Sequence, residues 1–324
     1  MAYQQIDSIV RNTLMPTVAD NISKEVKILD LLSDRIEIKA TTDTIKQAVK
    51  KSRSTTQGSY VRGGTFDTTP QTTRDTFTFN MAQLYQNVSL FGIDISSGAT
   101  GPDVIIDHLT YSLEEARTDF GQFIAEQMYG LGTASTSDPN PIVGLAAIAD
   151  DGSNAATYGD ETRSTYTWAK GGYTGSVGTL AFADLETAYN AVVVNGAKPD
   201  FFVTTPTLWT KLENLITLTN QVMAEKNVKG ITLNTGAQGI NFRGVPVEMD
   251  YFCTDGSVYL ITKKNLFIHV MKNKKHGNEG KLGLSWTGWK EPTNQDASIG
   301  QFLWYVQMTS DAPRNQYQLD AATA

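Results

Sequence analysis

The residues that most often perform chemistry in proteins are few in this chain and do not cluster. Three histidines, His108, His269 and His276, are far apart, and none has another histidine, a cysteine or a paired carboxylate at the spacing of metal ligands. The single cysteine, Cys253, follows Phe252 and is typical of a small buried hydrophobic residue. One cysteine excludes an internal disulfide and a cysteine-based zinc site. We therefore predict no metal site and no cofactor.

Acidic residues offer no better candidate for catalysis. Glu114 and Glu115 are adjacent in a predicted helix, where neighbouring side chains point in different directions. We interpret them as solvated charges or as an ion pair with another subunit, not as a general acid and base. Residues 150–152 resemble the start of a calcium loop but lack its remaining ligands, so a turn is favoured. Nucleophile-elbow, P-loop, dinucleotide-binding and zinc-protease motifs are absent. The sequence predicts no catalytic residues and no enzyme.

Charge is unevenly distributed along the 324 residues, whose net charge is −7. Residues 39–62 carry six basic side chains against Asp43, and residues 262–281 carry six lysines against Glu279. Such runs can orient like subunits toward one another or toward a polyanion, or they can be solvated faces. The acidic balance argues against sequence-specific nucleic-acid binding and leaves weak phosphate contact as an alternative. No signal core or long apolar span occurs, which predicts a soluble protein without a membrane partner.

One long stretch, residues 102–131, is expected to organise the other elements. Its apolar residues recur every three or four positions, as on one face of a helix. Pro102 suits a first helical turn, and Gly130 and Gly132 mark the end. At about 1.5 Å per residue the helix would be roughly 45 Å long. We predict a spine on which the other elements lie.

Two segments before this spine have little core of their own. Residues 6–32 carry a helical apolar stripe broken at Pro16, typical of an arm that docks on a neighbouring subunit or on its own chain. Residues 34–39 and 77–95 alternate like strands, and the residues between them are mostly polar. This pattern predicts a long hairpin that reaches away from the body. Its exposed edges would be a liability without a partner to lie on.

The part of the chain after the spine predicts a second, compact unit. Residues 152–178 are rich in Gly, Ser and Thr and are interpreted as surface loops or a short hairpin. From Leu180 a helix, a buried strand at 200–204 and a helix capped by Thr205 and Pro206 follow in order. Later segments alternate as strands. The order predicts an α+β unit, with final strands that return to the spine.

This order of parts resembles the major capsid proteins of tailed bacteriophages, whose fold is shared with the herpesvirus capsid floor and with encapsulins. The resemblance covers nearly the whole chain. It depends on this architecture and on three local phrases: GLAAIADDG at 144–152, KPDFFVTTPTLWTKL at 198–212 and FRGVPVEMDYFCTDGSVYLITKKNLFIHV at 242–270.

The resemblance implies an α+β phage capsid fold with five parts. These are an N-terminal arm at 1–34, an extended hairpin loop at 35–95, a peripheral domain at 96–179 with the spine at 102–131, an axial domain at 180–265, and return strands to the peripheral domain at 266–324. The implied function is a major capsid subunit that assembles into an icosahedral shell around double-stranded DNA. Candidate intersubunit contacts are Lys46, Lys50, Lys51, Arg53, Tyr60, Arg62, Glu114 and Glu115.

The same resemblance implies partners and leaves alternatives. The expected partners are other copies of the chain in hexamers and pentamers, a separate scaffolding protein, a portal and, through non-specific contact, packaged DNA. The expected location is the virion capsid, assembled in the host cytoplasm. An encapsulin that encloses a cargo enzyme is the alternative within the fold. An enzyme with its site in residues 180–270 is the alternative of another class.

Overall fold

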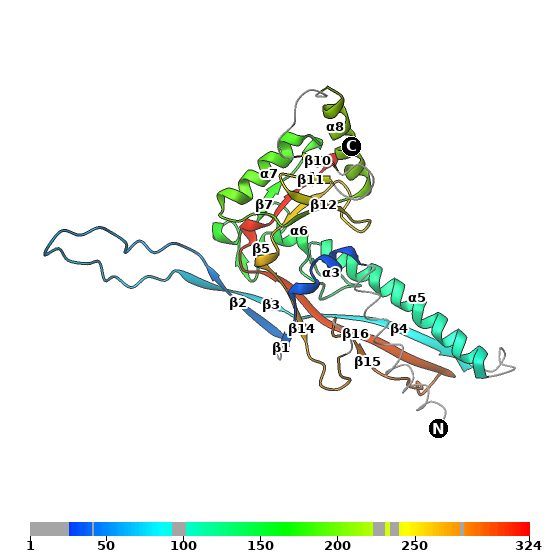
Figure 1. Cartoon of the computed structure of the whole chain (residues 1–324). Helices are drawn as coiled ribbons and strands as arrows, with labels where there is room; N and C mark the ends of the chain where they lie inside the picture. The colour runs from blue at the N-terminus through cyan, green and yellow to red at the C-terminus, as the bar shows by residue number, and fades with distance from the viewer. Residues whose placement is uncertain (1–25, 41, 93–101, 223–230, 234–239, 279–281) are drawn as a thin grey trace.

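In the computed structural model, a five-stranded sheet and one long helix form the lower body of the molecule (Figure 1). The structure describes residues 26–40, 42–92, 102–222, 231–233, 240–278 and 282–324. The sheet has the order β1 (Ile36–Ala40), β14 (Leu266–Met271), β16 (Ala297–Ser310), β15 (Ser285–Trp286), with β4 (Ala82–Phe91) along the other edge of β16. β16 is antiparallel to β4, β14 and β15, whereas β1 runs parallel to β14.

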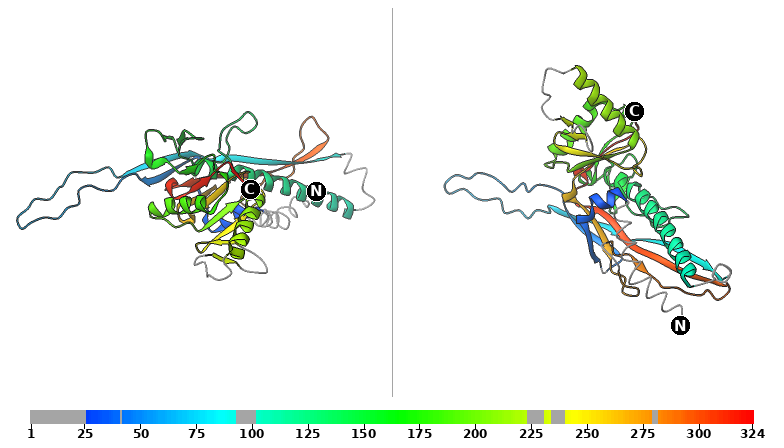
Figure 2. Two further views of the ribbon diagram at one scale, coloured as in Figure 1. Left: turned by 90° about the horizontal axis from the view of Figure 1, so that it is seen from above. Right: turned by 45° about the vertical axis from the view of Figure 1, so that its right-hand side comes forward.

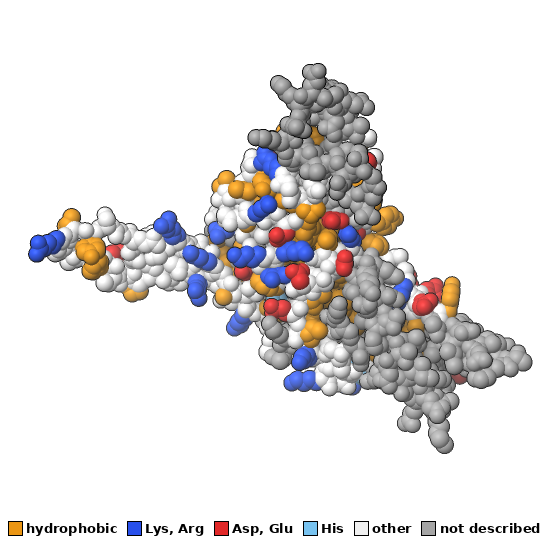
Figure 3. Space-filling view, viewed as in Figure 1, with side chains coloured by type: hydrophobic (Ala, Val, Ile, Leu, Met, Phe, Trp, Pro, Cys, Tyr) orange, Lys and Arg blue, Asp and Glu red, His pale blue; other side chains and the backbone are white. Residues whose placement is uncertain are grey.

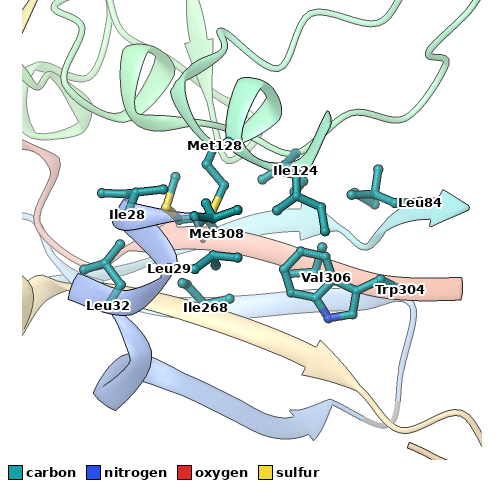
Figure 4. Close-up of a cluster of buried hydrophobic side chains, with 14 of the residues drawn as sticks. Ile28, Leu29, Leu32, Leu84, Ile124, Met128, Ile268, Trp304, Val306 and Met308 are labelled. Atoms are coloured by element: carbon teal, nitrogen blue, oxygen red, sulfur yellow. The ribbon is translucent and has the colours of Figure 1, made fainter. Parts of the chain in front are cut away.

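Helix α5 (Pro102–Tyr129) is the predicted spine and ends two residues earlier than expected. Its buried side chains include Phe120, Ile124 and Met128, which belong to one core cluster with Leu84 of β4 and Met308 of β16. Figure 4 shows Ile124 and Met128 above these strands. The spacing of the helical residues by three or four positions brings them to one face, as the sequence predicted. Gly121 beside Phe120 is also buried.

The end of the predicted N-terminal arm packs on its own chain. In helix α3 (Lys27–Leu31), Ile28 and Leu29 are fully buried, and Leu32 follows them into the same core (Figure 4). The short helix η2 (Ser33–Arg35) then leads into β1. Within residues 26–32 the alternative of docking on the chain's own core is therefore the correct one. Residues 1–25, which carry most of the predicted stripe, lie outside the described residues.

The predicted hairpin is present but shorter than residues 35–95. Its paired strands are β2 (Thr44–Lys50) and β3 (Arg74–Asn80), joined by residues 51–73. β1 and β4, which were expected to be parts of the hairpin, belong to the five-stranded sheet instead. Alternation alone could not separate them, because a strand with one buried face alternates whichever partner it pairs with. Figures 1 and 2 show the loop projecting away from the body.

A seven-stranded sheet forms the upper body, with the order β10 (Ile231–Leu233), β11 (Ile240–Phe242), β12 (Val245–Met249), β9 (Phe201–Thr204), β13 (Val258–Ile261), β17 (Tyr317–Leu319), β7 (Gly172–Thr174). Helices α7 (Phe182–Val194) and α8 (Pro206–Val222) pack on one face of this sheet, onto Phe202 and Leu260. The opposite face presents Val203 and Tyr259 to the core of the lower body. Because both faces are covered, β9 has no exposed residue, as the apolar run at 200–204 predicted.

The end of the chain differs from the prediction that it returns to the spine. β14, β15 and β16 do join the lower sheet, but β17 pairs with β13 and β7 in the upper sheet. β18 (Ala322–Thr323) pairs with β8 (Gly178–Thr179). The Gly-rich stretch before residue 180 supplies β7 to the upper sheet and is more than a surface loop. The remaining short elements are α6 (Leu145–Ile148), β5 (Thr157–Tyr158), β6 (Glu161–Thr162) and η3 (Thr167–Ala169) before residue 180, and η4 (Lys263–Asn265) and η5 (Pro313–Asn315) after it.

Candidate intersubunit surface

The root of the hairpin has an apolar face that fixes it to the body. Register pairs place Val49, Phe77 and Phe79 on one side of the two strands, and all three are buried. The Phe77 ring lies 5.0 Å from the ring of Tyr158 and 5.1 Å from that of Trp168, centroid to centroid. These aromatic contacts anchor one end of the hairpin.

Hydrogen bonds hold the same root in place. The Thr78 backbone N–H donates to the Gly159 carbonyl at 3.0 Å, and the Tyr158 hydroxyl accepts from the Ser310 N–H at 2.8 Å. The Gln307 side chain donates to the Asn80 carbonyl at 2.7 Å. The hairpin direction is thus set by the loop 155–169 and by strand β16. We call the loop residues 155–169 the seat of the hairpin.

A buried ion pair holds the seat together. Arg163 and Asp150 are both fully buried, with Arg163 Nη1 3.1 Å from Asp150 Oδ2. Arg163 also donates to the carbonyls of Ala147, Ala155 and Ala169. Asp150 accepts further bonds from the backbone N–H groups of residues 152, 154 and 155. Burial lowers the pKa of Arg163, an effect that Asp150 opposes. Sequence reasoning missed this pair, because a polar stretch gives no periodic sign of a buried arginine.

The other face of the hairpin root is exposed and basic. Lys46, Lys50 and Arg74 share it, and the register places Lys50 opposite Arg74. The residues between them on this face are Ala48, Thr76 and Thr78. Lys51 instead pairs with Asp75 on the inner face at 3.3 Å. Of the candidate lysines, then, two lie on this exposed face and the third is neutralised.

The tip of the loop exposes apolar side chains. Every residue from 57 to 72 is exposed, and Tyr60, Val61 and Phe66 are 66%, 78% and 68% exposed. The Tyr60 and Phe66 rings contact each other with centroids 4.8 Å apart. Figure 3 shows these orange patches beside a basic side chain at the end of the loop. Arg53, nearer the root, bonds to Gln57 at 2.7 Å, and Arg62 is exposed. Exposed aromatic residues on a projecting loop indicate a binding surface.

The two predicted spine residues lie away from the hairpin. Glu114 and Glu115 are both exposed on α5, which extends from the centre of the body on the side opposite the loop (Figure 1). The structure therefore brings the hairpin candidates together and separates Glu114 and Glu115 from them within one subunit.

A cleft of about 390 Å³ opens where the hairpin root meets the body. Three basic side chains line it: Lys50, Arg74 and Arg314. One carboxylate, Asp311, lies among them and accepts from the Asn265 side chain at 2.8 Å. Sequence reasoning missed Arg74 and Arg314. Arg74 could have been found from its alternation with Thr76 and Thr78, but Arg314 reaches the cleft only through the tertiary fold.

His269 and Cys253 belong to the residue types that can perform metal or redox chemistry, but here they have structural contacts. His269 Nε2 lies 3.0 Å from Thr309 Oγ1, within hydrogen-bond distance. Burial raises the pKa of the Cys253 thiol, which lies near Asp250. Among the described residues, no group of three histidine, cysteine or acidic side chains could hold a metal ion. No helix in the described segments is long and apolar enough to cross a bilayer. The His108 side chain lies outside what the structure describes.

Comparison with solved structures identifies the fold. No family model and no curated protein sequence matches this chain. A subunit of the cyanophage A-1(L) capsid is similar over 93% of both chains, with a TM-score of 0.73 and 18% identity. A chain of the capsid of Myoviridae phage XM1 is similar over 89% of this chain and 90% of its own length, with a TM-score of 0.55 and 11% identity.

An encapsulin is also similar to this chain. The SrpI encapsulin complex from Synechococcus elongatus PCC 7942 covers 89% of this chain and 85% of its own, with a TM-score of 0.54 and 13% identity. The TM-scores establish the fold. The chain has the α+β shell-protein fold of phage capsid subunits and encapsulins, as the sequence resemblance predicted.

Proposed function

We propose that this protein is the major capsid subunit of a tailed bacteriophage, assembling into a closed shell around double-stranded DNA. The observation that carries the proposal is the hairpin loop, which is seated firmly at its root and exposed throughout residues 57–72. The apolar side chains at the tip become buried only when another molecule covers them. Burial of apolar area contributes about 25 cal/mol per Å² to the free energy of binding, so a partner on the tip would be stabilised substantially. A second copy of the chain is always available as that molecule.

The fold supports a shell more than an isolated subunit. The solved capsid of cyanophage A-1(L) is more similar to this chain than the SrpI encapsulin is, with TM-scores of 0.73 and 0.54. We assign the lower body to the peripheral domain and the upper body to the axial domain of the resemblance. Under this proposal the remaining partners are a scaffolding protein, a portal and packaged DNA. Assembly would take place in the host cytoplasm.

Assembly of the purified full chain tests this function. We expect hexamers, pentamers or closed particles by size-exclusion chromatography and electron microscopy. A variant with Tyr60→Ser, Val61→Ser and Phe66→Ser should remain folded, because these side chains are mostly exposed, and should lose most assembly. A matched control is Thr65→Ser with Thr68→Ser in the same exposed loop. A wild-type chain that stays monomeric at all concentrations and salts, with or without scaffold, would refute the shell function.

The content of the particle separates the two shell functions. A phage head is expected to protect DNA from nuclease, whereas an encapsulin is expected to enclose a protein cargo. Recovery of a stoichiometric enzyme in place of DNA from native particles would favour the encapsulin alternative.

A further inference from the structure

We propose that the cleft at the hairpin root binds the carboxylates of an acidic stripe on α5 of a second copy of this chain. The inference rests on the proposed function and names the surface through which neighbouring subunits meet. The cleft side is formed by Lys50, Arg74 and Arg314. The stripe side is formed by Glu115, Asp119 and Glu126.

The cleft carries positive charge that the subunit itself does not neutralise. No ion pair to Lys50, Arg74 or Arg314 is formed within the described part of the chain. Asp311 is the only acidic residue in the lining. Three cations against one carboxylate leave a net positive recess. Because residues of both the hairpin root and the body line the recess, a bound carboxylate would contact both parts. Arginine favours such contacts through its fork of N–H donors.

The stripe on α5 carries the opposite charge. Glu115, Asp119 and Glu126 are spaced by four and seven residues and share one face of the helix with Gln122, and all four are exposed. The three carboxylates span roughly 16 Å at 1.5 Å per residue. None of them forms an ion pair with another described residue. Glu114 lies about 100° around the helix from Glu115. The structure therefore separates the two predicted residues and favours Glu115.

Within one subunit, the cleft and the acidic stripe lie on opposite sides of the molecule. In Figure 1 and in the right-hand view of Figure 2, the hairpin leaves one side of the body and α5 extends on the other. Complementary surfaces at opposite ends of one molecule produce a head-to-tail contact. Such a contact is heterologous, and it closes into a ring when the rotation between subunits permits. This arrangement is what a capsomer of like subunits requires.

Charge reversal tests the inference. Lys50→Glu with Arg74→Glu should reduce the yield of assembled particles about tenfold or more, because like charges would then meet at the contact. Glu115→Lys with Asp119→Lys should do the same. Mixing these two variants should restore hexamers, in which the two variants can alternate so that each acidic cleft meets a basic stripe and each basic cleft an acidic one. Size-exclusion chromatography with electron microscopy measures the yield, and circular dichroism checks that each monomer is folded.

Two controls match these changes in charge. Lys198→Glu with Lys272→Glu reverses two exposed cations that do not line the cleft, and Asp255→Lys with Glu291→Lys reverses two exposed carboxylates outside α5. Both are expected to assemble nearly as wild type. Failure of the mixture to assemble, or an equal loss in the controls, would overturn the inference.

The outcomes also separate this inference from the shell function. If the cleft variant forms normal particles, the inference is wrong and the shell function stands. If its particles form normally but retain less DNA, the cleft binds phosphate instead, which equally overturns the inference. If the wild type never assembles, both proposals fail.

Discussion

Removal of the Arg163 side chain is expected to have the largest local effect among the charged residues. Methionine at this position has a similar length but no hydrogen-bond donors. Arg163→Met would leave Asp150 buried without its cation and the carbonyls of Ala147, Ala155 and Ala169 without this donor. The seat of the hairpin would then lose its internal support.

The magnitude follows from the burial of both partners. Removal of one member of a buried ion pair costs about 3–5 kcal/mol, because the other charge stays buried and unpaired. Asp150 keeps its backbone N–H donors, so we expect about 3–4 kcal/mol, toward the lower end of that range. This is a large share of the ~5–15 kcal/mol that stabilises a typical protein.

Denaturant unfolding of the unassembled chain measures this loss. Asp150→Asn added to Arg163→Met removes the unpaired charge, so the double variant should lose less stability than Arg163→Met alone. Arg243→Met is the matched control, because Arg243 pairs with Glu186 at 3.1 Å near the surface and should cost about 1 kcal/mol or less. Equal losses for Arg163→Met and Arg243→Met would refute the reasoning.

Two further predictions concern side chains in the core of the lower body. Burial raises the pKa of Tyr129, Tyr158 and Tyr259 above the usual value of 10.0, so the folded chain favours their neutral form. The contribution of these tyrosines to stability should be constant below about pH 10 and fall above it by up to ~1.4 kcal/mol per pH unit for each tyrosine, as measured by unfolding between pH 8 and 11; a flat profile above pH 10 would contradict this. Gly159→Ala places a Cβ 2.6 Å from that of Phe77 at a φ of +57° and should lower the melting temperature of the chain, whereas Gly58→Ala, with open space around it, should not.

The elements that the sequence predicted well are those with a strong local signal. Pro102 and the glycines after Tyr129 bounded α5 to within two residues, because they act on the helix ends themselves. Thr205 and Pro206 located the start of α8 for the same reason. Lys46, Lys50 and Lys51 of the hairpin root were found as a run of charge, whereas Arg74 was not. Which of them faces the cleft depends on strand register, and that depends on the partner strand.

The parts that sequence could not predict depend on distant contacts. The strand at 317–319 returns to the upper sheet because it pairs with β13 and β7, and no local pattern encodes that choice. The seat is a second case. Its polar composition predicted a surface loop, yet Arg163 is fully buried there and pairs with the buried Asp150. A buried charge pair is invisible to a hydrophobic pattern because its cost is repaid by hydrogen bonds formed only in the fold.

The seat and the loop are best understood together. A loop without a core can bind a neighbour at a defined angle only if its root is rigid, since a free root would permit many angles of contact. Two phenylalanines against Tyr158 give that root its affinity for the body, but apolar packing alone tolerates small rotations. The Arg163 hydrogen bonds are directional, and they connect two carbonyls of the seat and the carbonyl of Ala147 to one guanidinium. Closed shells need a small set of contact angles. A costly buried ion pair at this position is therefore better explained by the direction that it gives the hairpin than by the stability that it adds.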